Sequence, residues 1–190
     1  MKARARSRVF FLFPLLIAST VLGIIFAMIW YHKTGRSGMR SLARGAFVAA
    51  LYALLVVLPP FASFAYGPVQ VRVAEALTVL PYLFPETIWG LTLGCFVANV
   101  LGGLGFWDFS LGTLCTFLAA FWTSRVRHPL LAPLPPVLVN GFGVAAYLAF
   151  LFRVPYGVTA SYILLGEAVA CYGLGYPLLV ALLKRGFRKE

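Results

Sequence analysis

Long apolar runs dominate this chain and constrain its fold more than any other feature. Seven runs, each near the ~20 residues that a helix needs to cross a bilayer core, are separated by breaks rich in glycine and proline. With 62% hydrophobic and 11% charged residues, the chain is unlike soluble proteins, in which about a quarter of residues are charged. We therefore predict an all-α integral membrane protein in a lipid bilayer, with runs near 9–31, 43–62, 69–84, 87–104, 109–124, 131–151 and 159–183.

The run 69–84 is short for a membrane span and contains two charged residues, Arg72 and Glu75. Irregular backbone at membrane depth is tolerated where protein surrounds it. We therefore expect a kinked or partly irregular segment there.

Basic residues gather in short clusters between the runs, and these clusters predict the orientation. The clusters at 125–127 and 184–189 are separated by two spans, and the cluster at 33–44 lies four spans earlier. Because cytoplasmic loops carry an excess of Lys and Arg, all three are expected inside, with a cytoplasmic C-terminus in a bacterial cell membrane. The same clustering accounts for the net charge of +11 without a nucleic-acid partner.

The first run, 9–31, does not fit this orientation, because it would place the basic residues of "MKARARSR" outside. An uncleaved signal-like segment, an extra helix and a helix lying on the inner surface all stay open. We favour an appended helix. The expected organisation is a basic N-terminus with that helix over 1–40, and a six-span membrane domain over 41–190 that holds the substrate site.

Polar residues within the spans fall in the outer half of this predicted domain, although the orientation was derived from other residues. They are Arg72, Glu75, Asn99, Asp108, Asn140 and Glu167. Ionisable residues inside membranes are rare and often functional. The pattern predicts a polar pocket that is open to the outside, with Arg72 and Glu75 at its outer rim.

Each polar residue also has a structural interpretation. Arg72 and Glu75, three residues apart, could simply neutralise each other, and Asn140 could hydrogen-bond a neighbouring helix; for these, structural and binding roles both stay open. For Asp108 we favour the role of a helix N-cap. Glu167 has no basic residue within helical reach in its own span, so we expect it to be functional.

Small residues predict where helices approach closely. Gly90, Gly94, Ala98 and Gly102 recur every fourth residue along one span, which is typical of an internal seam. A second set in the span 43–62 could be a docking face for another membrane protein. That set consists of Gly45, Ala46, Ala49, Ala50 and Ala53.

The sequence disfavours several classes of function. It contains no G-x-x-x-x-G-K-[ST] phosphate loop, so the chain cannot by itself couple ATP hydrolysis to transport. Its two histidines flank predicted cytoplasmic loops, and its three cysteines form no C-x-x-C pair, so we expect no catalytic centre, metal or cofactor. A substrate-capturing module and an ion-coupled secondary carrier remain, because an intramembrane carboxylate suits either.

Five segments resemble a known family of membrane proteins. They are "QVRVAEALTVLP", "GLTLGCFVANVLGG", "DFSLGTLCTFLAA", "PPVLVNGFGV" and "GEAVACYGLG". From about residue 42 to 183 the chain is similar to substrate-binding S components of energy-coupling factor (ECF) transporters, and specifically to the queuosine precursor transporter (QueT) family. An S component for another vitamin-like molecule is the related alternative.

The resemblance implies a six-helix protein that binds a 7-deazaguanine base from outside. It would be served by a transmembrane coupling subunit and two ATPase subunits, which alone use ATP. It also implies that the alanine face of the first core helix docks the coupling subunit, which maps to Ala46 and Ala50, with Ala49 and Ala53 beside them.

The chemistry of such a base suggests roles for the polar residues. One carboxylate can accept both the N1 hydrogen and the 2-amino group, and O6 needs a donor such as an amide. We expect Glu167 in the first role and Asn140 or Asn99 in the second, with Glu75 or Asp108 selecting a cationic aminomethyl precursor. Aromatic residues near the outer mouth could stack on the base or form an interfacial belt, which we favour. They are Trp107, Tyr156 and Tyr162.

Overall fold

The computed structural model describes residues 38–58, 72–102 and 105–189. The predicted run 9–31, the basic residues at 33–36 and the ends of some other runs lie outside the described residues. Within the described ranges the chain is helical and contains no strand. Its elements are α2 (Met39–Val57), 3-10 helix η1 (Val73–Tyr82), α4 (Thr87–Gly102), π-helix η2 (Asp108–Gly112), α5 (Thr113–Arg125), 3-10 helix η3 (Pro129–Leu131), α6 (Leu134–Phe152), α7 (Tyr156–Ala168), π-helix η4 (Val169–Gly175) and α8 (Tyr176–Lys184).

Three of the described helical stretches are long and apolar enough to cross a membrane. They cover Met39–Val57, Pro129–Phe152 and Tyr156–Lys184, the last being one 29-residue rod formed by α7, η4 and α8. Two shorter apolar helices, Val73–Tyr82 and Thr87–Gly102, lie beside them. These helices confirm an all-α, multi-pass membrane protein, while the count of six spans stays a prediction.

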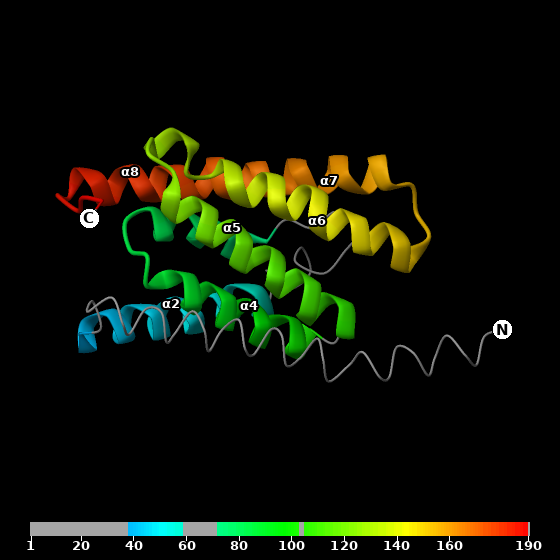
Figure 1. Ribbon diagram of the computed structural model, residues 1–190, viewed down its shortest axis with the longest axis horizontal. Coiled ribbons are helices and arrows are strands. Elements are labelled where there is room, and N and C mark those ends of the chain that lie inside the picture. The colour runs from blue at the N-terminus through cyan, green and yellow to red at the C-terminus, as the bar shows by residue number, and fades with distance from the viewer. Residues whose placement is uncertain (1–37, 59–71, 103–104, 190) are drawn as a thin grey trace. The chain divides into compact units, whose positions relative to one another are not determined.

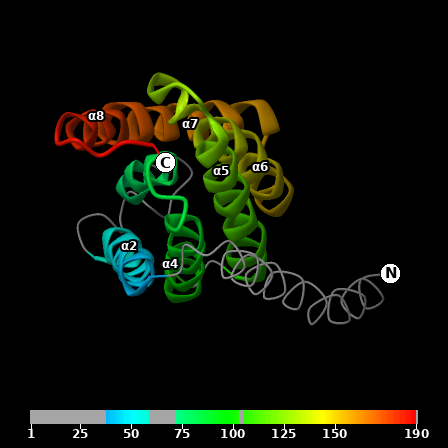
Figure 2. The same cartoon turned by 60° about the vertical axis from the view of Figure 1, so that its left-hand side comes forward.

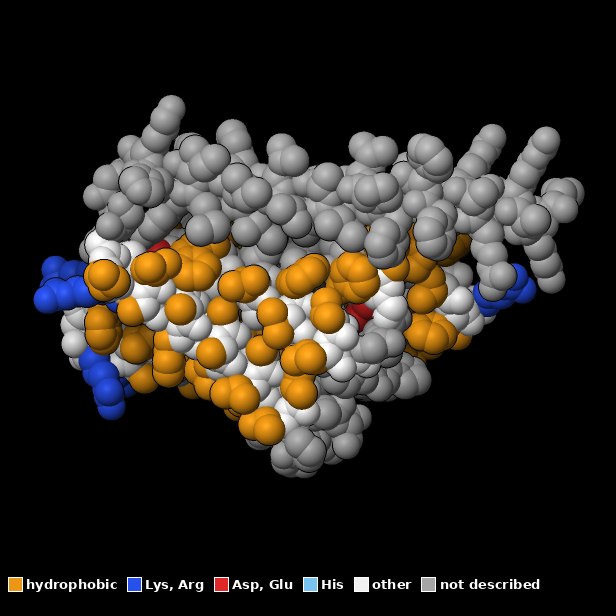
Figure 3. All heavy atoms as spheres, turned by 90° about the horizontal axis from the view of Figure 1, so that it is seen from below, with side chains coloured by type: hydrophobic (Ala, Val, Ile, Leu, Met, Phe, Trp, Pro, Cys, Tyr) orange, Lys and Arg blue, Asp and Glu red, His pale blue; other side chains and the backbone are white. Residues whose placement is uncertain are grey.

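In Figure 1 the rod of α7 and α8 lies on one side of residues 38–189 and α2 on the other, with α4, α5 and α6 between them. Successive helices pack on one another, α2 on α4, α4 on α5, α5 on α6 and α6 on α7. Apolar side chains cover the face seen in Figure 3, and the basic side chains in that view lie at its two ends. Such a surface suits hydrocarbon on the sides and water at the ends.

The short helix η1 is surrounded by other helices. It contacts α2, α4, α5, η4 and α8, and Figure 2 shows it between α2 and α8. Every residue of η1 except Val73 is buried. This confirms the expected irregular segment, and its burial explains how a 3-10 helix with Pro81 inside is tolerated at membrane depth.

The seam between α2 and α4 is made of small residues: the series of Gly90 and Gly94 lies in an internal seam, as predicted, but it packs on Gly45 and Ala49, which had been considered as part of a docking face. A Cβ added to Gly94 would lie 2.6 Å from the backbone oxygen of Ala49, and one added to Gly90 would collide with the backbone of Gly45. Only glycine permits so close an approach of two backbones. The same seam places Tyr52, which is fully buried, at the side of α2 that faces the core.

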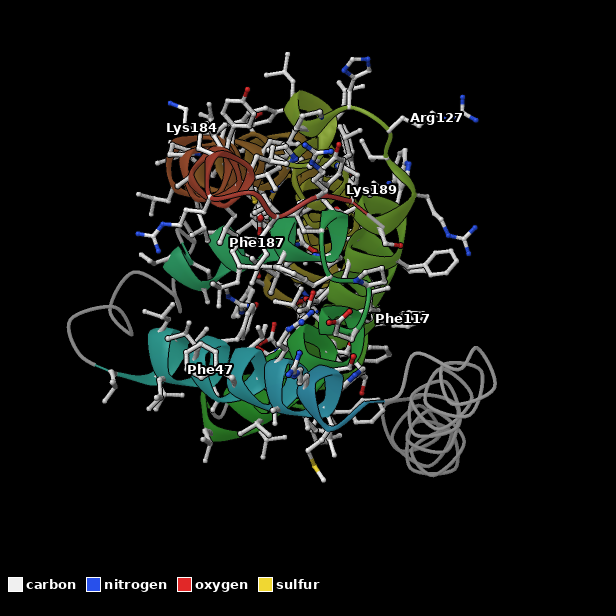
Figure 4. All side chains as sticks on the ribbon, turned by 90° about the vertical axis from the view of Figure 1, so that its left-hand side faces the viewer. Phe47, Phe117, Arg127, Lys184, Phe187 and Lys189 are labelled. Atoms are coloured by element: carbon white, nitrogen blue, oxygen red, sulfur yellow. The ribbon has the colours of Figure 1, made fainter. Side chains whose placement is uncertain are left out.

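Contacts at one end of the bundle bring the basic clusters of the described residues together. Arg44 forms an ion pair with Glu86 at 2.7 Å, and Lys189 donates to the backbone oxygen of Val126. Figure 4 looks onto this basic end, where Arg127, Lys184 and Lys189 are labelled. The described basic clusters thus lie at one end of the bundle, as predicted, whereas the location of that end in the cytoplasm stays a prediction.

The C-terminal tail folds back onto this end. The ring of Phe187 packs edge-on against Phe84 with centroids 5.5 Å apart. Lys189 lies 4.9 Å from the ring centroid of Tyr82, whose hydroxyl donates to the backbone oxygen of Arg127 at 3.0 Å. The tail therefore connects the last helix to the C-terminal end of η1.

Candidate functional site

Three irregular helical segments carry or adjoin the polar residues of the core. Glu75 lies in the 3-10 helix η1, Asp108 begins the π-helix η2, and Cys171 lies in the π-helix η4, which begins two residues after Glu167. Segments of π-helix are rare and occur frequently at functional sites. Their convergence marks this region as the candidate site.

A single amide joins two buried carboxylates from different helices. The Nδ2 of Asn140 in α6 donates to Oε2 of Glu75 at 3.3 Å and to Oε1 of Glu167 at 3.2 Å. The other oxygen of Glu75 accepts a 2.5 Å hydrogen bond from the hydroxyl of Tyr52. All four side chains are buried. We call Glu75, Asn140 and Glu167 the Asn140 bridge.

A second group, the Asp108 cluster, contains Arg72, Asn99, Asp108 and Tyr147. Arg72 forms an ion pair with Asp108 at 3.6 Å, and the Tyr147 hydroxyl donates to Oδ1 of Asp108 at 2.5 Å. Asn99 donates to the backbone oxygen of Asp108 at 3.1 Å. Within this cluster Oδ1 of Asp108 accepts a hydrogen bond from Tyr147, whereas Oδ2 faces Arg72 and accepts no hydrogen bond among the described residues.

Two buried cysteines, Cys171 and Cys95, adjoin these two groups. Cys171 contacts the backbone oxygen of Glu75 at 3.5 Å and a carboxylate oxygen of Glu167 at 3.7 Å. Cys95 accepts from Thr116 at 3.2 Å. Both thiols are fully buried. Close packing of η4 on η1 makes the first contacts possible, because a Cβ at Gly175 would lie 2.9 Å from the backbone of Ala76.

Two amide oxygens at the site have no hydrogen-bond partner among the described residues. They are Oδ1 of Asn140 and Oδ1 of Asn99, and both side chains are almost completely buried. A buried acceptor without a partner is unusual in a folded protein and is destabilising unless something donates to it. The two amides therefore have acceptor capacity to offer a ligand.

The six residues predicted from the sequence are all buried, and the structure brings them together in these two neighbouring groups. Their role in binding stays a prediction. The expected position at an outer rim differs from the structure: Asn140 lies in the half of α6 nearer to the basic end, and Glu75 contacts it there, so the Asn140 bridge is not at the end of the bundle opposite the basic residues.

The capping role expected for Asp108 is wrong. The helix that contains it already begins at Phe106, after Gly105, whose φ is 98°. The carboxylate is directed instead to Arg72 and Tyr147. The charge of Arg72 is thus matched across two elements, and not only by the neighbouring Glu75 considered from the sequence.

Sequence reasoning missed both tyrosines of the site. Tyr52 lies one helical turn after Ala49 on the same face as the small-residue seam, and a tyrosine on a buried face needs a partner for its hydroxyl. The place of Tyr52 on this small-residue face could therefore have indicated a buried tyrosine with a hydrogen-bond partner. Tyr147 occupies an ordinary place in an apolar helix and gives no comparable signal.

The three aromatic residues considered for stacking differ in their surroundings. Tyr156 and Tyr162 are each 46% exposed, which agrees with the interfacial belt interpretation. Trp107 packs against a buried apolar cluster that includes Tyr147. Among the described residues no group of three or more His, Cys, Asp or Glu side chains is arranged to hold a metal ion.

Comparison with known proteins gives the family. The family described as QueT transporter matches residues 42–184, well over half of the chain. The queuosine precursor transporter QueT of Lactococcus lactis subsp. cremoris (strain MG1363) is 29% identical over 140 residues, which are 67% of this chain and 83% of the relative. No solved structure matches the chain. The chain therefore belongs to the QueT transporter family, a family of transporters and not of enzymes.

Proposed function

We propose that this chain is the substrate-specific component of an ECF-type importer and captures a 7-deazaguanine precursor of queuosine. The observation that carries the proposal is the Asn140 bridge, a buried set of two carboxylates and one amide inside a member of the QueT family. The name of the Lactococcus relative supports the substrate class.

The donors and acceptors of the bridge fit the edge of such a base. A 7-deazaguanine presents N1–H and a 2-amino group side by side, and a carboxylate accepts both at once. Glu167 is our candidate for this contact, and Asn140 lies within 3.2 Å of it to donate to O6. Asn99, in the Asp108 cluster, is the alternative donor.

Energy for transport would come from partners, namely a transmembrane coupling subunit and two ATPase subunits. The exposed side of α2 supports a docking role: Ala46 and Ala50 are exposed on it, together with Phe47. Ala49 is only 8% exposed and packs in the α2–α4 seam, so we restrict the proposed docking face to Ala46 and Ala50. Ala53, which is half-buried, lies at the edge of that seam.

In this proposal the protein works in the bacterial cell membrane with its basic end in the cytoplasm. The clustering of Arg44, Arg127 and Lys189 at one end supports this orientation. The protein itself would hold no cofactor.

The direct test is equilibrium binding of 7-deazaguanine bases, guanine and unrelated vitamins to the purified chain without partners or ATP. We expect tight binding of a deazaguanine that is weakened at least about tenfold in Glu167→Gln, because a charge-assisted hydrogen bond contributes roughly 1.5–3 kcal/mol. Glu86→Gln, the same change at an acid of the basic end, is the matched control and should bind normally. Failure of the whole panel to bind would refute the substrate class.

Docking is tested separately by Ala50→Trp. This variant should keep its affinity for the ligand and lose uptake in cells, because the exposed face of α2 would no longer fit a flat partner surface. Normal uptake by the variant would rule out this face.

An ion-coupled carrier is the second candidate, favoured by the two carboxylates that are buried in the core, Glu75 and Glu167. Proteoliposomes that contain this chain alone distinguish the two. A carrier accumulates substrate on an ion gradient, whereas a capture component needs the coupling subunit and ATP.

A further inference from the structure

Three basic side chains meet at the basic end of the bundle. The C-terminal tail folds back so that Lys189 donates to the backbone oxygen of Val126, the residue between Arg125 and Arg127. Figure 4 shows Lys189 and Arg127 on the same side of this end, with Lys184 on the other side. We call Arg125, Arg127 and Lys189 the basic triad.

The acids of the chain do not balance the basic triad. Three of the five acids lie in the buried candidate site, and Glu86 pairs with Arg44 at 2.7 Å. Among the described residues no acid forms an ion pair with the triad. The fifth acid, Glu190, lies outside the described residues. Even a full negative charge on Glu190 beside the triad would leave an excess of positive charge.

Contacts with rings and backbone hold the three cations together. The guanidinium of Arg125 lies 4.7 Å from the ring centroid of Phe121, and Nζ of Lys189 lies 4.9 Å from that of Tyr82. Tyr82 in turn donates to the backbone oxygen of Arg127 at 3.0 Å. Partial burial and, after it, the charges of Arg125 and Arg127 lower the pKa of Lys189. Because like charges repel, an anion placed between these cations would be attracted by all three.

The basic triad adjoins an apolar face that suits an acyl chain. Leu118, Phe121 and Trp122 are exposed and follow one another at helical spacing along α5, and the same face ends at Arg125. Tryptophan is enriched where the hydrocarbon of a membrane meets water. A free anion would gain nothing from such a face, whereas a lipid would contact it along its length.

We propose that the basic triad binds the headgroup of an anionic phospholipid, with the phosphate between the three cations and an acyl chain along Leu118 and Trp122. Basic clusters at the ends of membrane helices attract anionic headgroups. A zwitterionic headgroup carries its own cation and gains much less from an excess of positive charge. This surface is separate from the buried candidate site, so the inference does not depend on the proposed substrate.

The test is thermal unfolding of the full chain in a neutral detergent with added lipid. One sample receives dioleoyl phosphatidylglycerol, and the other receives dioleoyl phosphatidylcholine, which has the same acyl chains and no net charge. At about a hundredfold excess over the Kd, the anionic lipid should raise the Tm by roughly 5–11 °C. The zwitterionic lipid should raise it by less than about 2 °C.

Two double variants locate the effect. Arg125→Gln with Arg127→Gln should lose most of the shift that phosphatidylglycerol causes. Lys184→Gln with Arg185→Gln removes the same charge from the same end of the bundle and should keep the shift. All four side chains are exposed, so both double variants should melt close to the wild-type chain without lipid.

A third double variant separates charge from structure. Arg125→Lys with Arg127→Lys keeps both charges and should retain at least about half of the shift, because the attraction is mainly Coulombic. Loss of the whole shift in this variant would overturn a site that depends on charge.

The remaining outcomes are equally decisive. Equal shifts with the two lipids would overturn the inference. Equal losses in the two glutamine variants would show that only the net charge of the basic end matters, which overturns the assigned place. Glycerophosphoglycerol, the headgroup without acyl chains, should cause no shift at the same concentration. If it acts as strongly as the lipid, the triad takes a free phosphate and the lipid assignment is overturned.

Discussion

Replacing Asn140 by alanine tests whether the bridge stabilises the fold. Asn140 is 2% exposed and donates to two carboxylates at 3.2 and 3.3 Å. Hydrogen bonds to charged groups contribute roughly 1.5–3 kcal/mol each, and these distances favour the lower value, so the two together are worth about 3 kcal/mol. At about 2–4 °C per kcal/mol for a chain of this size, their loss corresponds to roughly 6–12 °C in Tm.

Replacing the buried Asn140 side chain by alanine also removes packing contacts. A control variant on the same helix measures the loss of stability that comes from packing alone. Val144→Ala, one turn further along α6 and 5% exposed, loses apolar contacts but no hydrogen bond. Asn140→Ala should therefore melt roughly 6–12 °C below Val144→Ala. The assay is thermal unfolding in detergent, followed by a thiol-reactive dye that labels the buried Cys95 and Cys171 as they become accessible.

Equal melting temperatures for the two variants would refute the reasoning, because the two carboxylates would then not depend on the amide. The lipid-facing variant Phe142→Leu, at a side chain that is 50% exposed, should leave the Tm unchanged and calibrates the assay.

Further predictions concern stability away from the bridge. Tyr147→Phe removes a 2.5 Å hydrogen bond to a buried carboxylate and should lower the stability by about 1.5–3 kcal/mol, measured in the same melting assay. Gly94→Val should reduce the folded yield in size-exclusion chromatography, because overpacking costs about 1–3 kcal/mol, whereas Gly173→Val, with open space around it, should not. Glu86→Gln should lower the stability by at most about 1 kcal/mol through loss of the 2.7 Å pair with Arg44, and high salt should remove the difference.

Much of the architecture could be predicted because its causes are local. Apolar length predicted the helices, the spacing of Gly90 and Gly94 predicted an internal seam on their helix, and two charges in a short run predicted the irregular η1. Each of these signals is contained within one segment of the chain.

The pairing within the site could not be predicted in the same way, because it depends on contacts between distant segments. Glu75 and Glu167 are separated by most of the domain, and the bond of Asn140 to both depends on how α6 packs against η1 and η4. The π-helices were equally hidden, since residues 108–112 and 169–175 read as ordinary apolar helix.

The π-helix η4 determines how the two ends of the last rod face one another. Each π turn accommodates about one residue more than an α turn, so η4 sets the rotation between Glu167 before it and Leu179 after it. If residues 169–175 formed an α-helix instead, one part of the rod would be turned against the other by about 100°, the angle that one residue spans in an α-helix. With Leu179 fixed in the apolar core, Glu167 would then face away from Asn140. The backbone geometry of this helix, and not only its amino acids, thus brings Glu167 to Asn140.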